Sequence, residues 1–116
     1  EVAAPVDRTI DGLSLVPLFK SGGEEVLPRD ELLWHFPHYR HAPGPYSIIR
    51  KGDWKLIKFW EGIFELYNLK DDLSEEVNLA ERNPEKVKAL DALLLKRLDE
   101  TNARLPIPNP EFSGGN

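Results

Sequence analysis

The feature that most constrains this chain is a stripe of apolar residues near its carboxyl end. Its members recur at spacings of three, four and four residues: Val87, Leu90, Leu94 and Leu98, with Leu93 and Leu95 beside them. Asn83 suits the N-cap, Pro84 the first helical position and Glu85 the positive end of the helix dipole. The pattern predicts one long helix that must bury this stripe, and each stripe residue contributes ~1.5–3 kcal/mol when buried.

Short, bulky segments separated by turn signals precede this helix. Apolar and aromatic residues favour strands over four ranges: 32–36, 46–50, 54–60 and 63–67. Lys51-Gly52-Asp53 and Glu61-Gly62 provide tight turns between the last three and predict an antiparallel meander. The expected fold class is α+β: a small antiparallel sheet of about four strands packed against one long carboxyl-terminal helix, plus a short amino-terminal helix.

The predicted sheet carries large apolar groups on both of its faces. On the longest strand Trp54, Leu56 and Trp60 point one way, whereas Ile57 and Phe59 point the other. An antiparallel sheet with one wet face alternates more cleanly between apolar and polar residues. One helix can cover only one face, so we expect a neighbouring domain outside this chain to cover the second.

One further element is expected near the amino terminus. An apolar cluster that follows Asp11-Gly12 predicts a short helix, with Ser14 as its N-cap and Pro17 in its first turn. Gly22-Gly23 supplies the glycine-rich end that such a helix requires.

Domain organisation follows from length and composition. We expect a single domain over residues 1–116, with an extended lead-in over 1–12 and an extended, proline-spaced tail over 106–116. Methionine is absent from all 116 residues, which indicates a piece of a longer protein.

Charge and residue usage exclude several classes of partner. Twenty acidic residues against fifteen basic ones give a net charge of -5, whereas binding to nucleic acid calls for a basic surface. Without cysteine there is no disulfide, thiolate metal site or cysteine nucleophile. No apolar run approaches the ~20 residues that span a bilayer. We therefore expect neither nucleic acid nor a membrane as a partner.

All three histidines fall within seven residues, at positions His35, His38 and His41. Imidazole can bind a metal or an anion and can face a substrate, but aromatic loops also carry histidines structurally. No fourth ligand marks a metal site, so we assign no metal. On a strand His35 and His38 would face opposite sides, unless Pro37 bends the chain.

Charged residues elsewhere offer weaker candidates. An acidic run lacks the spacing and central glycine of a calcium loop and predicts a solvated turn; it comprises Asp71, Asp72, Glu75 and Glu76. Lys55 and Lys58 suit an ordinary strand face. Arg50, close to the aromatic segments, would suit a sulfate or carboxylate because its guanidinium forms paired hydrogen bonds with such groups.

Five blocks follow one another in a specific order. They are Asp11-Gly12-Leu13-Ser14-Leu15-Val16-Pro17-Leu18, Trp34-His35-Phe36-Pro37-His38-Tyr39, Ile49-Arg50-Lys51-Gly52-Asp53-Trp54-Lys55-Leu56-Ile57, Phe64-Glu65-Leu66-Tyr67-Asn68-Leu69 and Glu75-Glu76-Val77-Asn78-Leu79-Ala80. With the following helix they cover roughly residues 10–105. The ordered set resembles the carboxyl-terminal subdomain of the formylglycine-dependent sulfatase family, in its bacterial arylsulfatase-like branch.

The resemblance implies part of a hydrolase that cleaves sulfate esters with a formylglycine, made from cysteine or serine, beside a bound calcium ion. In the family both lie in a larger amino-terminal α/β domain. The motif from which the formylglycine is made has proline two residues after the cysteine or serine, whereas Ser14 has proline three residues on. We therefore expect no catalytic residue and no metal here, an inactive fragment, and a periplasmic or extracellular parent enzyme.

The resemblance also implies substrate-binding residues and partners. His35 and His38 are candidates to hydrogen-bond or charge-pair with a sulfated sugar, with Tyr39 and Arg50 as weaker candidates. The expected partners are the amino-terminal sulfatase domain and a sulfated carbohydrate, and an exposed sheet face would promote self-association. The alternative is a stand-alone binding module for acidic or sulfated glycans without catalysis. A third interpretation is a domain that only braces its parent.

Overall fold

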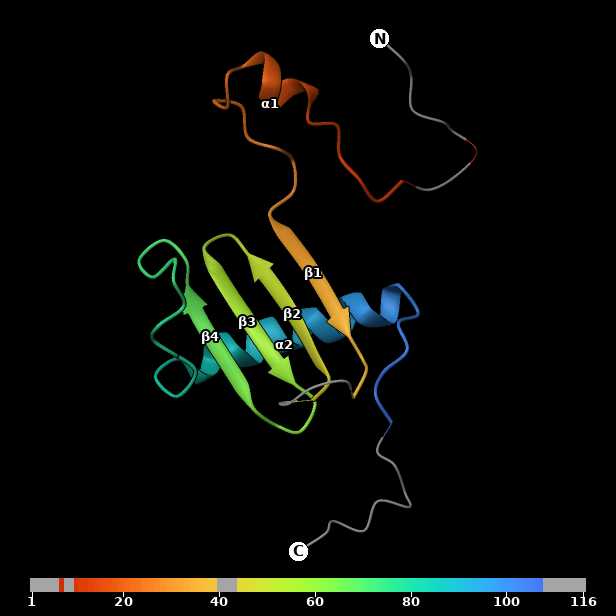
Figure 1. The fold of residues 1–116 in the computed structure, drawn as a ribbon, viewed down its shortest axis with the longest axis vertical. Coiled ribbons are helices and arrows are strands. Elements are labelled where there is room, and N and C mark those ends of the chain that lie inside the picture. The colour runs from red at the N-terminus through yellow and green to blue at the C-terminus, as the bar shows by residue number, and fades with distance from the viewer. Residues whose placement is uncertain (1–6, 8–9, 40–43, 108–116) are drawn as a thin grey trace, which may run out of the picture. The chain divides into compact units, whose positions relative to one another are not determined.

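The computed structural model describes residue 7 and residues 10–39 and 44–107. The chain separates into two compact units, Glu1–Asp30 and Glu31–Asn116, and each is described by itself. Figure 1 shows the helices and strands that they contain. The single domain expected over 1–116 stays a prediction.

The first unit contains α1, Val16–Lys20. Glycine ends it as predicted, because Gly22 and Gly23 adopt φ values of +67° and +95°. The Gly23 N–H donates to the Leu18 carbonyl at 2.9 Å and the Gly22 N–H to the Phe19 carbonyl at 3.4 Å. These two bonds satisfy carbonyls that the helix itself leaves unpaired.

The start of α1 differs from the prediction by one residue. Leu15 holds the N-cap position, and Ser14 lies before it, with its Oγ accepting from the Val16 N–H at 3.3 Å. Pro17 lies in the first turn as expected. The Ser14 prediction was wrong by one residue, because the first intrahelical hydrogen bond, from the Phe19 N–H, ends on the Leu15 carbonyl at 3.1 Å.

The second unit contains one antiparallel sheet in the order β1-β2-β3-β4. Its strands are β1 (Glu31–Phe36), β2 (Tyr46–Lys51), β3 (Trp54–Phe59) and β4 (Phe64–Asn68). The turns lie where glycine was expected, since Gly52 adopts φ +57° between β2 and β3 and Gly62 adopts φ +99° between β3 and β4. The predicted meander and the α+β class are confirmed.

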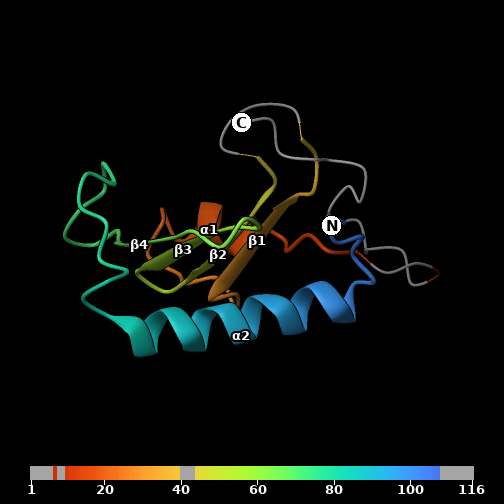
Figure 2. The same cartoon turned by 90° about the horizontal axis from the view of Figure 1, so that it is seen from below.

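The long helix α2, Pro84–Glu100, follows the sheet and covers one of its faces (Figure 2). The core between them consists of Ile49, Leu56, Leu66, Leu90, Leu94 and Leu98. Val87 is half-buried against this core and Leu95 is 38% exposed, so the predicted stripe is the buried face. Asn83 occupies the N-cap position, but its side chain donates to the Leu79 carbonyl at 3.2 Å and caps nothing.

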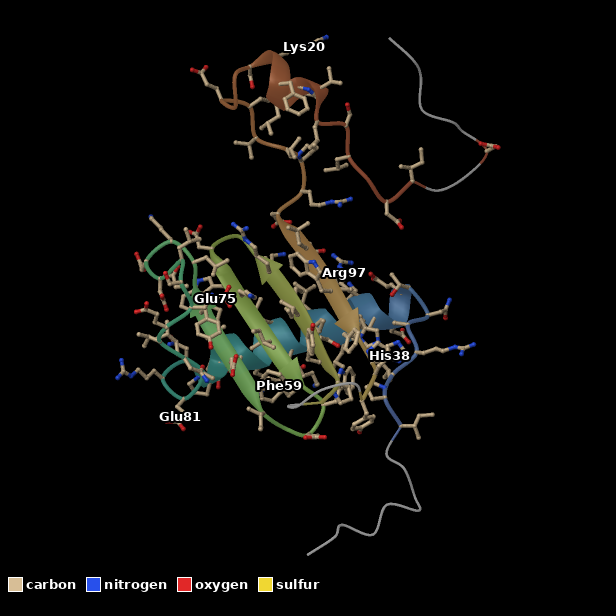
Figure 3. All side chains as sticks on the ribbon, viewed as in Figure 1. Lys20, His38, Phe59, Glu75, Glu81 and Arg97 are labelled. Carbon is tan, nitrogen blue, oxygen red and sulfur yellow. The ribbon has the colours of Figure 1, made fainter. Side chains whose placement is uncertain are left out.

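Ion pairs join the strands of the sheet to elements outside it. Arg97 on α2, labelled in Figure 3, donates from Nε to Oε1 of Glu31 on β1 at 2.7 Å. Lys55 on β3 lies 2.7 Å from Oε2 of Glu75 in the connection that follows β4. Both contacts hold an element outside the sheet against a strand, so these side chains stabilise the domain.

The acidic run forms a turn, as predicted. The carboxylate of Asp72 accepts the backbone N–H groups of Glu76 (3.1 Å) and Val77 (2.9 Å). These bonds hold the pKa of Asp72 below its usual range, because they stabilise the ionised form. Asn78 then docks the segment on β4 by accepting the Leu66 N–H at 3.0 Å.

In the described part of the chain no helix is long and apolar enough to cross a membrane.

Candidate functional site

The face of the sheet opposite α2 is also apolar. Cross-strand partners share a face, so the register assigns three rows to it: Leu32–Arg50–Lys55–Tyr67, Trp34–Ile48–Ile57–Glu65 and Phe36–Tyr46–Phe59. We call this set the open face. Trp34 is 48% exposed and Leu32 41%, although indole and leucine side chains strongly favour burial. The expectation that both faces carry large apolar groups is confirmed, and α2 covers one of the faces (Figure 2).

The third row of the open face is a continuous set of rings that ends at His38. The Phe36 ring stacks on Tyr46 with centroids 5.5 Å apart, and Tyr46 lies 6.2 Å from Phe59. The imidazole of His38 meets the Phe36 ring edge-on at 5.3 Å. Figure 3 shows His38 and Phe59 at the same end of the sheet. This aromatic row therefore extends from the open face to the exposed imidazole of His38.

His35 lies on the opposite side of β1, the side that α2 covers. Its Nδ1 is 2.7 Å from Oγ of Ser47, its cross-strand partner, and its Nε2 is 2.8 Å from the carbonyl oxygen of Arg104. The Trp60 indole N–H donates to the same Ser47 oxygen at 2.9 Å. Ser47 is fully buried. Both ring nitrogens of His35 are therefore used inside the domain.

The side chains of His35 and His38 consequently have different neighbours. His35 and His38 face opposite sides as the strand period predicts, and Pro37 does not bring them together. The third histidine, His41, lies outside the described residues. Over the described ranges 10–39 and 44–107 the structure brings together no group of three His, Cys, Asp or Glu side chains that could hold a metal.

The other two candidates lie at different places. Tyr39 follows His38 and is 63% exposed. Arg50 is on the open face, but it is four residues along β2 from Tyr46, roughly 13 Å at the usual strand rise. Its Nε–H donates to the Gly52 carbonyl at 3.2 Å. The structure therefore brings Tyr39 to the His38 end of the sheet and keeps Arg50 near the other end.

Two further carboxylates lie near Tyr67 and near Gly44. The Tyr67 hydroxyl donates to Oε2 of Glu65 at 3.1 Å. Burial of the ring and this carboxylate raise the pKa of Tyr67, so the phenol stays neutral on an apolar face. A Cβ added at Gly44, two residues before β2, would lie 3.0 Å from Oε1 of Glu61. The Glu61 carboxylate therefore lies next to the backbone of Gly44.

Sequence reasoning missed Ser47 and Arg104, the two partners of His35. A small polar residue inside an apolar strand was the available signal for Ser47. Arg104 contributes its backbone carbonyl from 69 residues away, so its side chain gives no signal of this contact.

Comparisons with known proteins identify the family of this chain. The family model described as N-sulphoglucosamine sulphohydrolase, C-terminal, matches residues 1–104. A sulfatase of Formosa agariphila is 34% identical over 91 residues, which are 72% of this chain and 16% of that protein. Arylsulfatase K of Gallus gallus is 31% identical over 98 residues, which are 78% of this chain and 18% of that protein. This chain thus spans less than a fifth of the length of these relatives.

A solved structure has the same fold. It is that of BT4656 in complex with its substrate D-glucosamine-2-N,6-O-disulfate, with a TM-score of 0.66 and 28% sequence identity. The match covers 90% of this chain and 22% of that one. The chain therefore belongs to the N-sulphoglucosamine sulphohydrolase C-terminal family and is the carboxyl-terminal domain of a sulfatase.

Proposed function

We propose that the whole protein removes sulfate from a sulfated glucosamine and that this domain completes the enzyme without performing the chemistry. The matching family model is described by an N-sulfated glucosamine, and the substrate of BT4656 is a glucosamine with two sulfate groups. These two findings support an amino sugar as the substrate class. The domain's own geometry supports its place in the enzyme.

The chemistry itself would belong to the amino-terminal domain. A formylglycine needs a cysteine or serine in its maturation motif, and this chain has no cysteine and no such serine motif. Over the described residues no cluster of acidic side chains or histidines suits a calcium ion. The residues present therefore do not fit either group, and the isolated domain is expected to be inactive. The parent's proposed location, periplasmic or extracellular, rests on the family resemblance.

The open face is the surface that we assign to the catalytic domain. Leu32 and Trp34, two residues apart on the same face of β1, leave much of their apolar surface exposed. Neighbouring exposed apolar side chains of this kind favour a protein interface. The alignments cover only 16% and 18% of the two relatives, which supports a covalently linked partner as its occupant.

Docking on the open face would place the catalytic domain close to His38. The aromatic row joins the open face to His38, so a catalytic domain packed on Tyr46 and Phe36 would lie next to the imidazole. An exposed imidazole can donate to a sulfate oxygen or a sugar hydroxyl, and the Tyr39 ring can stack on a sugar. The observation that carries the proposal is this continuous row of rings from the open face to an exposed histidine. Contacts by His35 and Arg50 stay predictions, and the geometry favours them less.

Docking can be tested in the full-length protein with a matched pair of substitutions. Leu32 on the open face and Leu95 on α2 are similarly exposed, at 41% and 38%. Leu32→Lys is expected to loosen the two domains, which increases proteolysis between them and lowers sulfate release. Leu95→Lys is expected to change neither quantity. Equal behaviour of the two variants would contradict docking through the open face.

The alternative, a stand-alone glycan-binding module, makes the opposite prediction for the isolated domain. Such a module would be monodisperse and would bind sulfated oligosaccharide as tightly as the full-length protein does. The proposal expects weak or no binding by the isolated domain, and self-association through its open face. Size-exclusion chromatography and titration calorimetry distinguish the two.

A further inference from the structure

Both ends of the segment 37–45 are tied to one buried hydroxyl, that of Ser47. On the β1 side, His35 Nδ1 lies 2.7 Å from this oxygen. From the end of β3, the Trp60 indole donates to it at 2.9 Å. Trp60 also donates its backbone N–H to the Pro45 carbonyl at 3.1 Å, where the segment rejoins β2. His35 and Trp60 therefore clamp the departure and the return of this segment.

The partners assign a direction to each bond in this clamp. The Arg104 carbonyl can only accept, so Nε2 of His35 carries the hydrogen. In the neutral ring Nδ1 then accepts, and the Ser47 hydroxyl donates to it while its oxygen accepts from Trp60. The Trp60 indole N–H, the Ser47 hydroxyl, both His35 ring nitrogens and the Arg104 carbonyl are thus paired with one another. No ring nitrogen of His35 is left for a substrate.

We propose that His35 is a positioning residue that acts on the sulfated substrate through His38 rather than by contact. This inference rests on the proposed function, in which His38 borders the pocket. His35 fixes the backbone near the end of β1, just before Pro37. The next residue, His38, has its ring against Phe36, whose side chain lies on the other face of the sheet. A buried network on one side of the sheet thus sets the place of a binding group on the other.

The proposal predicts that loss of a wholly buried hydroxyl changes substrate kinetics. Ser47 has no exposed surface, so it cannot touch a substrate. Its removal frees the His35 ring and the departure point of the segment. Because a displacement of about 1 Å in a binding group can cost on the order of 10²-fold in rate, we expect kcat/KM to fall about 10- to 100-fold.

The test uses the full-length enzyme and kcat/KM for sulfate release from N-sulfated glucosamine. Ser47→Ala, His35→Ala and His38→Ala are each expected to lower kcat/KM, and His35→Gln is expected to recover most of the His35 loss. Glutamine offers one acceptor and one donor, as the neutral imidazole does. In the His38→Ala background, His35→Ala is expected to add less than about 3-fold, because residues that act through one another are not additive.

A control separates positioning from general destabilisation. Asn78 holds the Leu66 N–H and the Phe64 carbonyl at 3.0 and 3.2 Å, in the region of β4. Asn78→Ala is expected to lower the unfolding temperature and leave kcat/KM unchanged. Should Ser47→Ala fail to fold, the two His35 variants decide the question: recovery by glutamine supports the proposal, and equal impairment overturns it.

Two outcomes distinguish this inference from the function on which it rests. Unchanged kinetics for Ser47→Ala beside an impaired His38→Ala would overturn the positioning role alone. Multiplying effects of His35→Ala and His38→Ala would also overturn it and would favour direct contact by His35. Unchanged kinetics for His38→Ala would overturn both the role of this edge in the pocket and the inference built on it.

Discussion

Lys58 on β3 lies with its Nζ 2.7 Å from Oδ1 of Asp91 on α2 and ties the helix to the sheet. The ammonium also lies over the rings of Trp60 and Phe64, at 5.2 and 5.3 Å from their centroids. Both charged side chains are mostly buried, with 15% and 21% of their surfaces exposed. The pair is therefore less screened than an ion pair on the surface.

Removal of one partner from this pair should destabilise the domain. Asp91→Ala is expected to lower the free energy of unfolding by about 1–3 kcal/mol, more than for an exposed pair because Lys58 loses its carboxylate in a partly dry site. Lys96→Ala is the control, since Lys96 and Glu100 form an exposed pair at 3.8 Å. It should cost less than about 0.5 kcal/mol. Equal losses in urea unfolding would contradict this assignment.

The centre of α2 offers a second test of the packing. Leu94 is fully buried, whereas Leu95, the next residue, is 38% exposed. Leu94→Ala is expected to cost about 2–5 kcal/mol, because it removes buried methyl groups and leaves a cavity. Leu95→Ala preserves helix propensity and should cost less than about 1 kcal/mol. Similar unfolding midpoints for the two variants would mean that a different face of α2 is buried.

Asp72 should contribute to the acid sensitivity of the fold. The N–H groups of Val77 and Glu76 hold the pKa of its carboxyl below the usual range in the folded state. A carboxyl whose folded pKa is lowered stabilises the fold above its unfolded pKa, and this stability is lost as pH falls through the folded pKa. Asp72→Asn should therefore reduce stability near neutral pH and flatten its loss in acid. Parallel stability curves for both proteins between pH 7 and pH 2 would contradict this.

Gly44 should be required for the segment that carries His38. Its φ of +100° strains any L side chain, and a Cβ would approach Glu61 to 3.0 Å. Gly44→Ala is expected to cost on the order of 1–3 kcal/mol and to raise KM in the full-length enzyme. Gly52→Ala is the control, because φ is +57° there and its Cβ would meet no atom within 4 Å. It should lower stability without changing KM.

Much of the fold could be predicted because local patterns determine it. The leucine period defined the buried face of α2, and the glycine turns defined the ends of the strands. The alternation along β3 also showed that both sheet faces are apolar. These signals depend on neighbours along the chain, which a sequence displays directly.

The candidate site could be predicted only in part. The strand period separates His35 from His38, yet the fate of His35 depends on Ser47 and on a carbonyl 69 residues away. Every residue has a backbone carbonyl, so the sequence pattern does not show which one will accept a hydrogen bond from His35. Arg50 resembled an anion ligand by type and neighbourhood, but the register puts it four residues along β2 from the aromatic row. Tertiary pairing decided both cases.

The central claim is that this domain lends His38 to the substrate pocket of a sulfatase acting on sulfated glucosamine. The most direct test is sulfate release by the full-length protein from glucosamine 2-N,6-O-disulfate, for the unaltered enzyme and for His38→Ala. The account predicts turnover by the unaltered enzyme and a raised KM or reduced kcat for the variant. No sulfate release from any sulfated glucosamine, or identical kinetics for the two proteins, would contradict it.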